Sequence, residues 1–283
     1  MGIWMKLRFL FRFRLKCKWK GKGLFGSAVF VLLFFVCAFG SRAEGNAVAL
    51  EDGKLKEEIY AQLGKGEGEP LYAEELEEHK GKIRLIDSIS IHNGEELDLV
   101  RTYCSMGDVY EWQVQFAPDL EGWTQEQLEG LGDLEQGVRI TGTKDRVVPA
   151  SVLPYFTGTR ELYFDIRDIT GRIPAGKGFP DNVKEVYLDS YASARYHTLL
   201  ACMRGSGVES LVCHMDAGLT TGQGFWLDQT AGMGQLEYLD AGECRIRVGD
   251  AAQLEGSRLR ELVGVLDKRT DFSFLDAVPS LEK

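Results

Sequence analysis

Residues 159–166 read TRELYFDI, and similar phrases return as VKEVYLDS at 183–190, VESLVCHM at 208–215 and LRELVGVL at 259–266. Each phrase holds an apolar-x-apolar pair, the pattern that sends alternate side chains to opposite faces of a β-strand. The first residue of the pair falls at Val114, Val138, Leu162, Val186, Leu211, Leu239 and Leu262. Successive intervals are 24, 24, 24, 25, 28 and 23 residues, which indicates an internal repeat.

A repeat of this length predicts a stacked architecture. Each unit contributes only two or three inward apolar residues, too few for a core of its own, so the units must stack to bury them. We therefore expect an α/β solenoid of about seven short parallel strands with loop and helix returns. Ala192–Met203 is expected to be one return helix, since Gly205 and Gly207 follow it as stop signals. Ile89 and Ile91 offer a degenerate earlier turn of the repeat.

The repeat resembles that of the leucine-rich-repeat family. The family pattern LxxLxLxxN/CxL is matched in spacing by Leu236, Leu239, Ala241, Cys244 and Ile246. Residues 169–174, ITGRIP, are similar to the L-x-G-x-I-P stretch of one subclass. The resemblance implies a binding protein but names no ligand, because the family binds many unrelated partners.

Residues 44–86 are similar to the helical N-terminal cap of secreted bacterial leucine-rich-repeat proteins. Leu55, Ile59 and Leu63 recur at i, i+4 and i+8, which gives a helix one apolar face. The resemblance implies that this helix and a second short helix cover the first strand of a solenoid spanning 87–267.

Residues 268–283 are expected to form a C-terminal cap or tail. This segment is charged and carries no repeat. Phe272, Phe274 and Leu275 are expected to pack on the last strand, since the open end of a stacked sheet needs cover.

Residues 1–43 have the features of an export signal. Met1–Gly23 holds eight cationic side chains and no acidic one, and Leu24–Gly40 is an uncharged apolar run. Ser41 and Ala43 then place small residues at the −3 and −1 positions of a cleavage site. The apolar run is also near the lower length limit for a membrane span, so an uncleaved signal anchor stays open. With either outcome we expect an exported protein, periplasmic, cell-surface or secreted, that touches a membrane only through this segment if it is uncleaved.

The charge of the remaining chain limits its partners. Residues 1–43 hold nine of the 33 Lys and Arg and none of the 43 Asp and Glu, which leaves 24 basic against 43 acidic residues, a net charge of −19. Such a charge repels phosphate backbones, so we expect no nucleic-acid partner. Four cysteines remain, and this number allows three full disulfide pairings, among which the sequence does not choose. They are Cys104, Cys202, Cys213 and Cys244. The alternative is that two or more of them are small buried apolar residues, which we expect for Cys213.

The alternation of side chains also fixes an outward face. One outward column is expected to hold Gln115, Arg139, Tyr163, Tyr187, Val212, Asp240 and Val263. The neighbouring column is expected to hold Ala117, Thr141, Asp165, Asp189, His214 and Gly242. Tyr163 should then stack beside Tyr187, and Asp165 should lie beside Asp189 with His214 one strand further on. Exposed tyrosines beside acidic groups are typical of recognition surfaces, so these five residues are the candidate ligand-binding residues. The alternative is that they are ordinary exposed strand residues.

The sequence offers little for catalysis. Asp165, Asp189 and His214 have the residue types of a cation site or an acid/base group, but such triplets are common on surfaces. Cys213 and His214 are neighbours on a strand and should point to opposite faces, which argues against a thiol nucleophile. There is no HExxH or GxSxG motif and no zinc-type cysteine spacing. We expect no catalytic residue, no metal and no cofactor.

The sequence therefore predicts a binding scaffold that holds a protein or other surface ligand on the outward face of a parallel sheet. A structural or assembly protein anchored at the membrane by residues 24–40 is the alternative. A cell-surface hydrolase is less favoured, because it would need a convergent acid, base or nucleophile.

Overall fold

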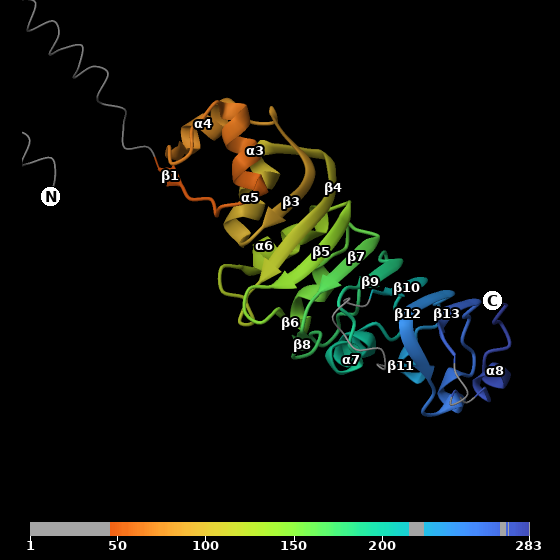
Figure 1. The fold of residues 1–283 in the computed structure, drawn as a ribbon. Coiled ribbons are helices and arrows are strands. Elements are labelled where there is room, and N and C mark those ends of the chain that lie inside the picture. Colours follow the sequence, from red (N-terminus) through yellow and green to blue (C-terminus); the bar gives the residue numbers. More distant parts are fainter. Residues whose placement is uncertain (1–45, 215–223, 267–269, 271, 283) are drawn as a thin grey trace, which may run out of the picture. The chain divides into compact units, whose positions relative to one another are not determined.

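The computed structural model describes residues 46–214, 224–266, 270 and 272–282 (Figure 1). The chain divides into two units, Met1–Asn46 and Ala47–Lys283, and the helices and strands described here all lie in the second. The expected export signal at 1–43 and the alternative anchor at 24–40 lie outside the described residues. Within those residues, no helix combines the length and the apolar character that crossing a membrane requires.

The centre of this unit is one sheet of nine described strands, and every pairing in it is parallel. The strand order is β11-β12-β10-β9-β7-β5-β4-β3, and β13 also pairs with β12. The strands are β3 (Ile83–Ile91), β4 (Cys104–Phe116), β5 (Gly137–Gly142), β7 (Glu161–Asp165), β9 (Glu185–Leu188), β10 (Ser210–Cys213), β11 (Gly224–Trp226), β12 (Tyr238–Arg247) and β13 (Glu261–Val265). The chain is an α/β protein with a mostly parallel sheet. The expected number of about seven strands was too low, because β11 was not foreseen and the degenerate first turn is a full strand.

The apolar column predicted from the repeat is present in the sheet. From β5 to β13 the paired residues are Val138, Leu162, Val186, Leu211, Leu239 and Leu262. All are buried except Leu262, which is partly buried at the edge of the sheet. The 24-residue interval places equivalent residues opposite one another because each strand is followed by a return of nearly constant length.

The predicted register at β4 is wrong by two residues. Trp112 lies opposite Val138, while Val114 lies opposite Ile140. The strand carries three alternating apolar residues, Trp112, Val114 and Phe116, and equal spacing favoured the wrong one. A longer β4–β5 connection explains the shift, since it holds α6 (Gln125–Gly130) and the 3-10 helix η1 (Leu131–Asp133).

The shift changes the outward columns at the same place. Gln113, rather than Gln115, lies beside Arg139, and Gln115 lies beside Thr141 in the column predicted for Ala117. From β5 onward, the predicted column that holds Arg139 and the two tyrosines agrees with the structure: Arg139 pairs with Tyr163, and Tyr163 pairs with Tyr187.

Two helices precede the sheet, in the region where the resemblance implied helices, and the first strand of the main sheet begins at Ile83, inside the predicted cap range 44–86. They are α3 (Lys54–Leu63) and α4 (Ala73–Glu78), and the antiparallel pair β1 (Ala47–Val48) and β2 (Leu71–Tyr72) accompanies them. On α3, Leu55 and Ile59 are buried and Leu63 packs partly against the core, so the helix uses the predicted apolar face. The helix packs on β3, the edge strand of the sheet (Figure 1).

The returns are a mixture of short helices and one small strand pair. Besides α6 and η1 they contain α5 (Gly94–Tyr103), β6 (Val147–Pro149), η2 (Ala150–Tyr155), β8 (Asp168–Thr170), α7 (Ser193–Cys202), η3 (Leu227–Thr230) and η4 (Ala251–Leu254). Helix α7 matches the predicted return helix at Ala192–Met203. Strands β6 and β8 pair in parallel away from the main sheet.

The C-terminal segment partly follows the prediction. Phe274 begins the short helix α8 (Phe274–Ala277) and is 1% exposed, so it packs into the core. Phe272 and Leu275 are about half exposed, so the expectation that they also pack on the last strand was wrong. Further on, the N–H of Glu282 donates to the carbonyl of Arg260 at 2.8 Å, which fixes the chain end beside the start of β13.

Candidate functional site

The candidate site lies on the outward face, which we define as the side chains of Glu111, Gln113, Arg139, Glu161, Tyr163, Asp165, Glu185, Tyr187, Asp189 and His214. They come from β4, β5, β7 and β9 and from the residues directly after β9 and β10. Their neighbours along each strand point into the core, because side chains alternate along a strand. Cys213 is buried while His214 beside it is exposed, which confirms that these two point to opposite faces.

The two tyrosines form a stacked pair, as the repeat predicted. The ring centroids of Tyr163 and Tyr187 are 4.4 Å apart and the ring planes differ by 9°. Each phenol donates to a glutamate two residues earlier on its own strand, Tyr163 to Glu161 at 2.9 Å and Tyr187 to Glu185 at 2.8 Å. Each ring is therefore held by stacking on the other ring and by the hydrogen bond from its phenol to a carboxylate.

The surroundings keep both phenols protonated. Burial is the largest cause that raises the pKa of Tyr187 to about 12, and the hydrogen bond to Glu185 adds to it. The pKa of Tyr163 is also raised, by burial first and then by Glu161. Both groups act as neutral hydrogen-bond donors with an aromatic face at any physiological pH.

A glycine makes room for the ring of Tyr163. Gly137 lies between Glu111 and Glu161 on the outward face, and a Cβ atom there would come within 3.1 Å of Tyr163 Cε2. A Cβ atom at this position would crowd the ring of Tyr163, which would have to shift slightly. The glycine is therefore part of the local geometry of the tyrosine pair.

Arg139 joins the two ends of the outward face. Its guanidinium bonds both carboxylate oxygens of Glu111 at 3.1 Å and also bonds Asp189, two strands away from β5. Its Cζ atom lies 5.2 Å from the ring centroid of Tyr163, within cation–π distance. A planar, five-donor guanidinium is suited to such a bridging role.

The structure brings the predicted acidic residues and His214 together only in part. His214 Nδ1 lies 3.1 Å from Asp189 Oδ1, so this pair is in direct contact. Asp165 instead accepts from Arg146 at 2.6 Å. Both carboxylates thus have basic partners. Across the described residues, His, Cys, Asp and Glu side chains form no group of three that could hold a metal ion.

The cysteines do not add a reactive group to this face. Cys104, Cys202, Cys213 and Cys244 are free thiols. Complete burial raises the pKa of Cys213 well above its usual value, so it stays protonated and behaves as a small apolar core residue.

Sequence reasoning missed several residues of the outward face. Glu161 and Glu185 were not chosen, although the repeat itself contained the signal: both stand directly before the apolar pair, in ELYF and EVYL. Arg139 was placed in the correct column, but its reach to Asp189 depends on side-chain length and direction rather than on spacing. Outside this face, His92 pairs with Glu96 at 3.0 Å, a contact that the sequence analysis also missed.

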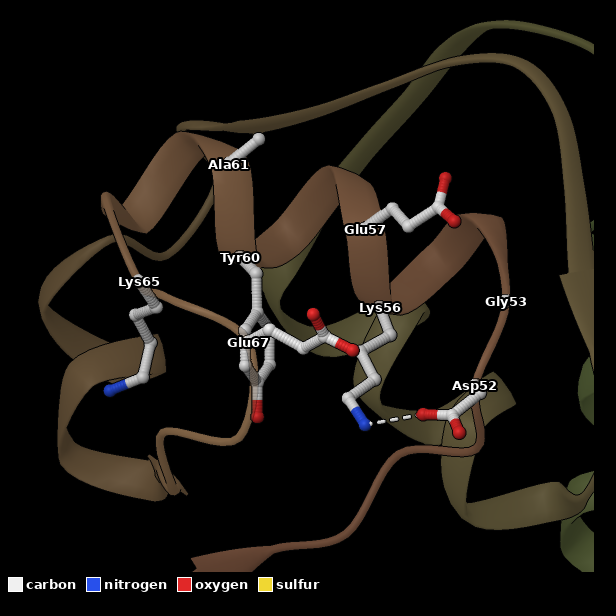
Figure 2. A pocket seen from close by; sticks show the side chains of 8 residues that line it. All are labelled: Asp52, Gly53, Lys56, Glu57, Tyr60, Ala61, Lys65 and Glu67. Atoms are coloured by element: carbon white, nitrogen blue, oxygen red, sulfur yellow. Dashed lines mark hydrogen bonds and ion pairs between the residues drawn. The ribbon is translucent and has the colours of Figure 1, made fainter.

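A pocket lies beside helix α3 (Figure 2). It has a volume of about 600 Å³ and is lined by Asp52, Gly53, Lys56, Glu57, Tyr60, Ala61, Lys65 and Glu67. Lys56 is bound to Asp52 at 2.7 Å, and Lys65 is bound to Glu75 at 2.7 Å. Since both lysines already have carboxylate partners, this pocket has no basic group ready for a ligand.

Comparison of the chain with family models and with curated proteins finds no match. What the outward face does is therefore inferred from its own geometry and from the sequence.

Proposed function

We propose that this chain is an exported binding protein of the leucine-rich-repeat type, and that its outward face holds a protein or other surface ligand. The repeat of apolar pairs and the parallel register of the strands support a stacked solenoid. The basic and apolar segments of residues 1–43 support export. The excess of acidic residues supports a basic partner over a nucleic acid.

The stacked pair of Tyr163 and Tyr187 carries the proposal. Both rings are half-buried and fixed by Glu161 and Glu185, so a partner that covers them does not have to freeze freely rotating side chains. Tyrosine offers a large apolar surface together with a polar end, which is why it is common at the centre of binding interfaces. A protein surface of this kind binds through area and complementarity rather than through a reactive group.

The polar groups around the tyrosines favour binding over catalysis. Arg139 is occupied by Glu111 and Asp189, and Asp165 is occupied by Arg146. A general acid or base needs a hydrogen-bonding position open to a substrate. His214 is the exception, since 57% of its side chain is exposed and Asp189 occupies only its Nδ1, so the preference for binding rests on the occupied Arg139 and Asp165.

The test is a capture experiment with the wild type and two variants, each of which replaces two tyrosines by alanine. The purified protein is cross-linked to components of cell-envelope and culture-medium extract, and the retained protein or glycan is identified. Tyr163→Ala/Tyr187→Ala removes the stacked pair. Tyr60→Ala/Tyr155→Ala removes two other half-buried tyrosines, on α3 and η2, whose phenols are also hydrogen-bonded.

We expect one defined partner to be retained by the wild type and by the control variant, and to be lost with the first variant. Circular dichroism and thermal unfolding would establish that both variants are folded. Equal retention by all three proteins, or retention by none, would contradict the proposal and leave the tyrosines as ordinary strand residues.

A further inference from the structure

The column of the sheet that holds the stacked tyrosines continues onto β10 and β12, which follow β9 in the order of the strands (Figure 1). Tyr187 pairs with Val212 on β10, and Val212 pairs with Asp240 on β12. Ser210 and Val212 are outward side chains of β10, and both are half-buried. We call these two residues the β10 strip. Because both side chains are short, the face is lower at the β10 strip than at the tyrosines beside it.

The second face of the Tyr187 ring is directed toward the β10 strip. Its first face stacks on Tyr163, with ring centroids 4.4 Å apart and ring planes that differ by 9°. This separation is close to the spacing of about 4.8 Å between strands, so the two rings face each other across the strands. The ring of His214 is tilted by 32° at 6.1 Å from that of Tyr187, so it borders the second face without stacking on it. The described side chains therefore leave room for a flat group above the β10 strip.

Tyr238 and Asp240 border the β10 strip on its other side, since they lie opposite Ser210 and Val212 on β12. Strands β9 and β12 are two strand spacings apart, roughly 9.6 Å. A group held midway would lie about 5 Å from an aromatic ring on β9, within the limit of about 6 Å for a cation–π contact. The width of the strip therefore suits a single side chain of a partner.

The carboxylates beside the β10 strip have no basic partner in the described part of the chain. Glu185 accepts from a phenol at 2.8 Å, and Asp240 accepts from a backbone N–H at 2.7 Å, so both carboxylates are held in place. The ion pairs between described residues include three other carboxylates of the sheet face, at Glu111, Asp165 and Asp189. The negative charge that is left without a base thus lies on both sides of the strip.

The other end of the same stack shows which group suits such a place. The Cζ atom of Arg139 lies 5.2 Å from the ring centroid of Tyr163, and its guanidinium bonds both carboxylate oxygens of Glu111. One guanidinium therefore contacts a ring face and a carboxylate together. At the β10 end, Tyr187 offers a ring face and Asp240 offers a carboxylate in the same column of the sheet.

We propose that the β10 strip receives an arginine side chain of a protein partner, with the guanidinium against the ring of Tyr187 and between the carboxylates of Glu185 and Asp240. A planar guanidinium can stack on a ring and bond carboxylates at its edge, whereas an ammonium group acts only as a point charge. The inference rests on the proposed function, because it names the chemistry of the partner that the same face binds.

The experiment titrates the purified protein, labelled with ¹³C on its tyrosine rings, and follows the ring resonances of Tyr187 by NMR. A Tyr187→Phe variant assigns them. The probe is the capped peptide acetyl-Ala-Arg-Ala-amide. Its controls carry citrulline, which has nearly the same shape without the charge, or lysine in place of arginine. We expect a saturable shift with the arginine peptide, weaker binding of the lysine peptide and no saturable shift with the citrulline peptide.

Matched variants separate the β10 strip from the general negative charge of the chain. Val212→Arg fills the strip with the protein's own guanidinium and is expected to weaken binding of the arginine peptide at least about tenfold. Asp240→Asn keeps an acceptor for the N–H two residues on and is expected to weaken it about fivefold. Tyr110→Arg is the control for the added charge, on β4 at a position that is 64% exposed. Asp119→Asn is the control for the lost charge, since Asp119 also accepts from the N–H two residues on.

Both control variants are expected to bind as the wild type does, because their sites lie on or after β4, four strands from β10, where salt screens exposed charges. The inference is overturned if the arginine peptide gives no saturable shift, if the citrulline or lysine peptide binds as tightly, or if a control variant loses as much affinity as its matched variant. In the capture experiment, a partner that is lost with Tyr163→Ala/Tyr187→Ala and kept with Val212→Arg would overturn this inference and leave the proposed function standing.

Discussion

At the scale of single residues, a buried carboxylate organises the first loop after β3. Glu96 is 1% exposed, and its two oxygens accept from the N–H of Glu51 at 2.9 Å, the N–H of His92 at 2.8 Å and His92 Nδ1 at 3.0 Å. Burial raises the pKa of Glu96, but the bonds from His92 and from the two backbone N–H groups outweigh it, so the pKa is lowered overall. The bond to Glu96 is also the main cause that raises the pKa of His92.

This pair predicts a pH window for stability. A lowered carboxylate pKa stabilises the fold above its unfolded value near 4.5, and this contribution is lost as the pH falls through the folded pKa. A raised histidine pKa stabilises the fold below its unfolded value near 6.5, and this contribution is lost as the pH rises through the folded pKa. The free energy of unfolding of the wild type should therefore exceed that of His92→Gln most between these two values, and less at pH 8. Urea unfolding across this range checks it, and a constant difference between the two proteins would contradict it.

The sequence predicted those residues of the candidate site whose positions on the strands follow from the repeat. Tyr163 and Tyr187 occupy the same place in neighbouring units, so parity alone predicted their stacking. The Glu96–His92 pair was not predicted, although the spacing of four residues and the N-cap Asn93 between them were visible in the sequence HNGEE. A pair that occurs once has no repeat to mark it, and the bond from the backbone N–H of Glu51 to Glu96 joins residues 45 positions apart.

At the scale of elements, a side chain of α3 hydrogen-bonds to the backbone of β3, the edge strand of the sheet. The amide of Gln62 donates to the carbonyl of Arg84 at 2.7 Å and accepts from the N–H of the same residue at 2.8 Å. These two bonds reproduce the pairing that a neighbouring strand would give. Unpaired edge strands are prone to pair with other chains, and covering them is a common protection.

Replacing this amide should open the edge locally. Gln62→Met keeps side-chain length and helix propensity but loses both bonds, so we expect a loss of about 0.5–1 kcal/mol, because the bonds are partly exposed to water. Hydrogen exchange at the amide of Arg84 should become faster. Gln125→Met is the control, since Gln125 bonds only to the side chains of Glu129 and Tyr155. Unchanged exchange at Arg84 in the first variant would show that α3 protects this edge in another way.

At the scale of the whole molecule, the sequence predicted the order and direction of the strands better than their ends. The buried column from Val138 to Leu262 was predicted because the apolar pairs recur at nearly equal intervals along the chain. At β4 the same reasoning failed, because Trp112, Val114 and Phe116 satisfy the alternation equally well and only the length of the return decides between them. Strand β11 was missed because Gly224–Trp226 has no place in the repeat and pairs with the far end of β12.

The same column predicts how the cost of a cavity varies along the sheet. Leu211 is fully buried, with Val186 on one side and Leu239 on the other. Leu262 lies on β13, pairs with Leu239 alone and is partly buried. Leu211→Ala should therefore lower the free energy of unfolding by about 3 kcal/mol and Leu262→Ala by about 1 kcal/mol, since both the lost transfer energy and the residual cavity grow with burial.

Urea unfolding of the two leucine variants measures this difference, and hydrogen exchange shows where it acts. Because the strands of the sheet pair with their immediate neighbours, Leu262→Ala should speed exchange in β12 and β13 and leave β5 unchanged, whereas Leu211→Ala should affect strands on both sides. Equal losses from the two variants would mean that the sheet unfolds as one block whose stability does not depend on position. Unequal losses with local exchange would instead mean that the end of the sheet can open while the tyrosine pair on β7 and β9 keeps its geometry.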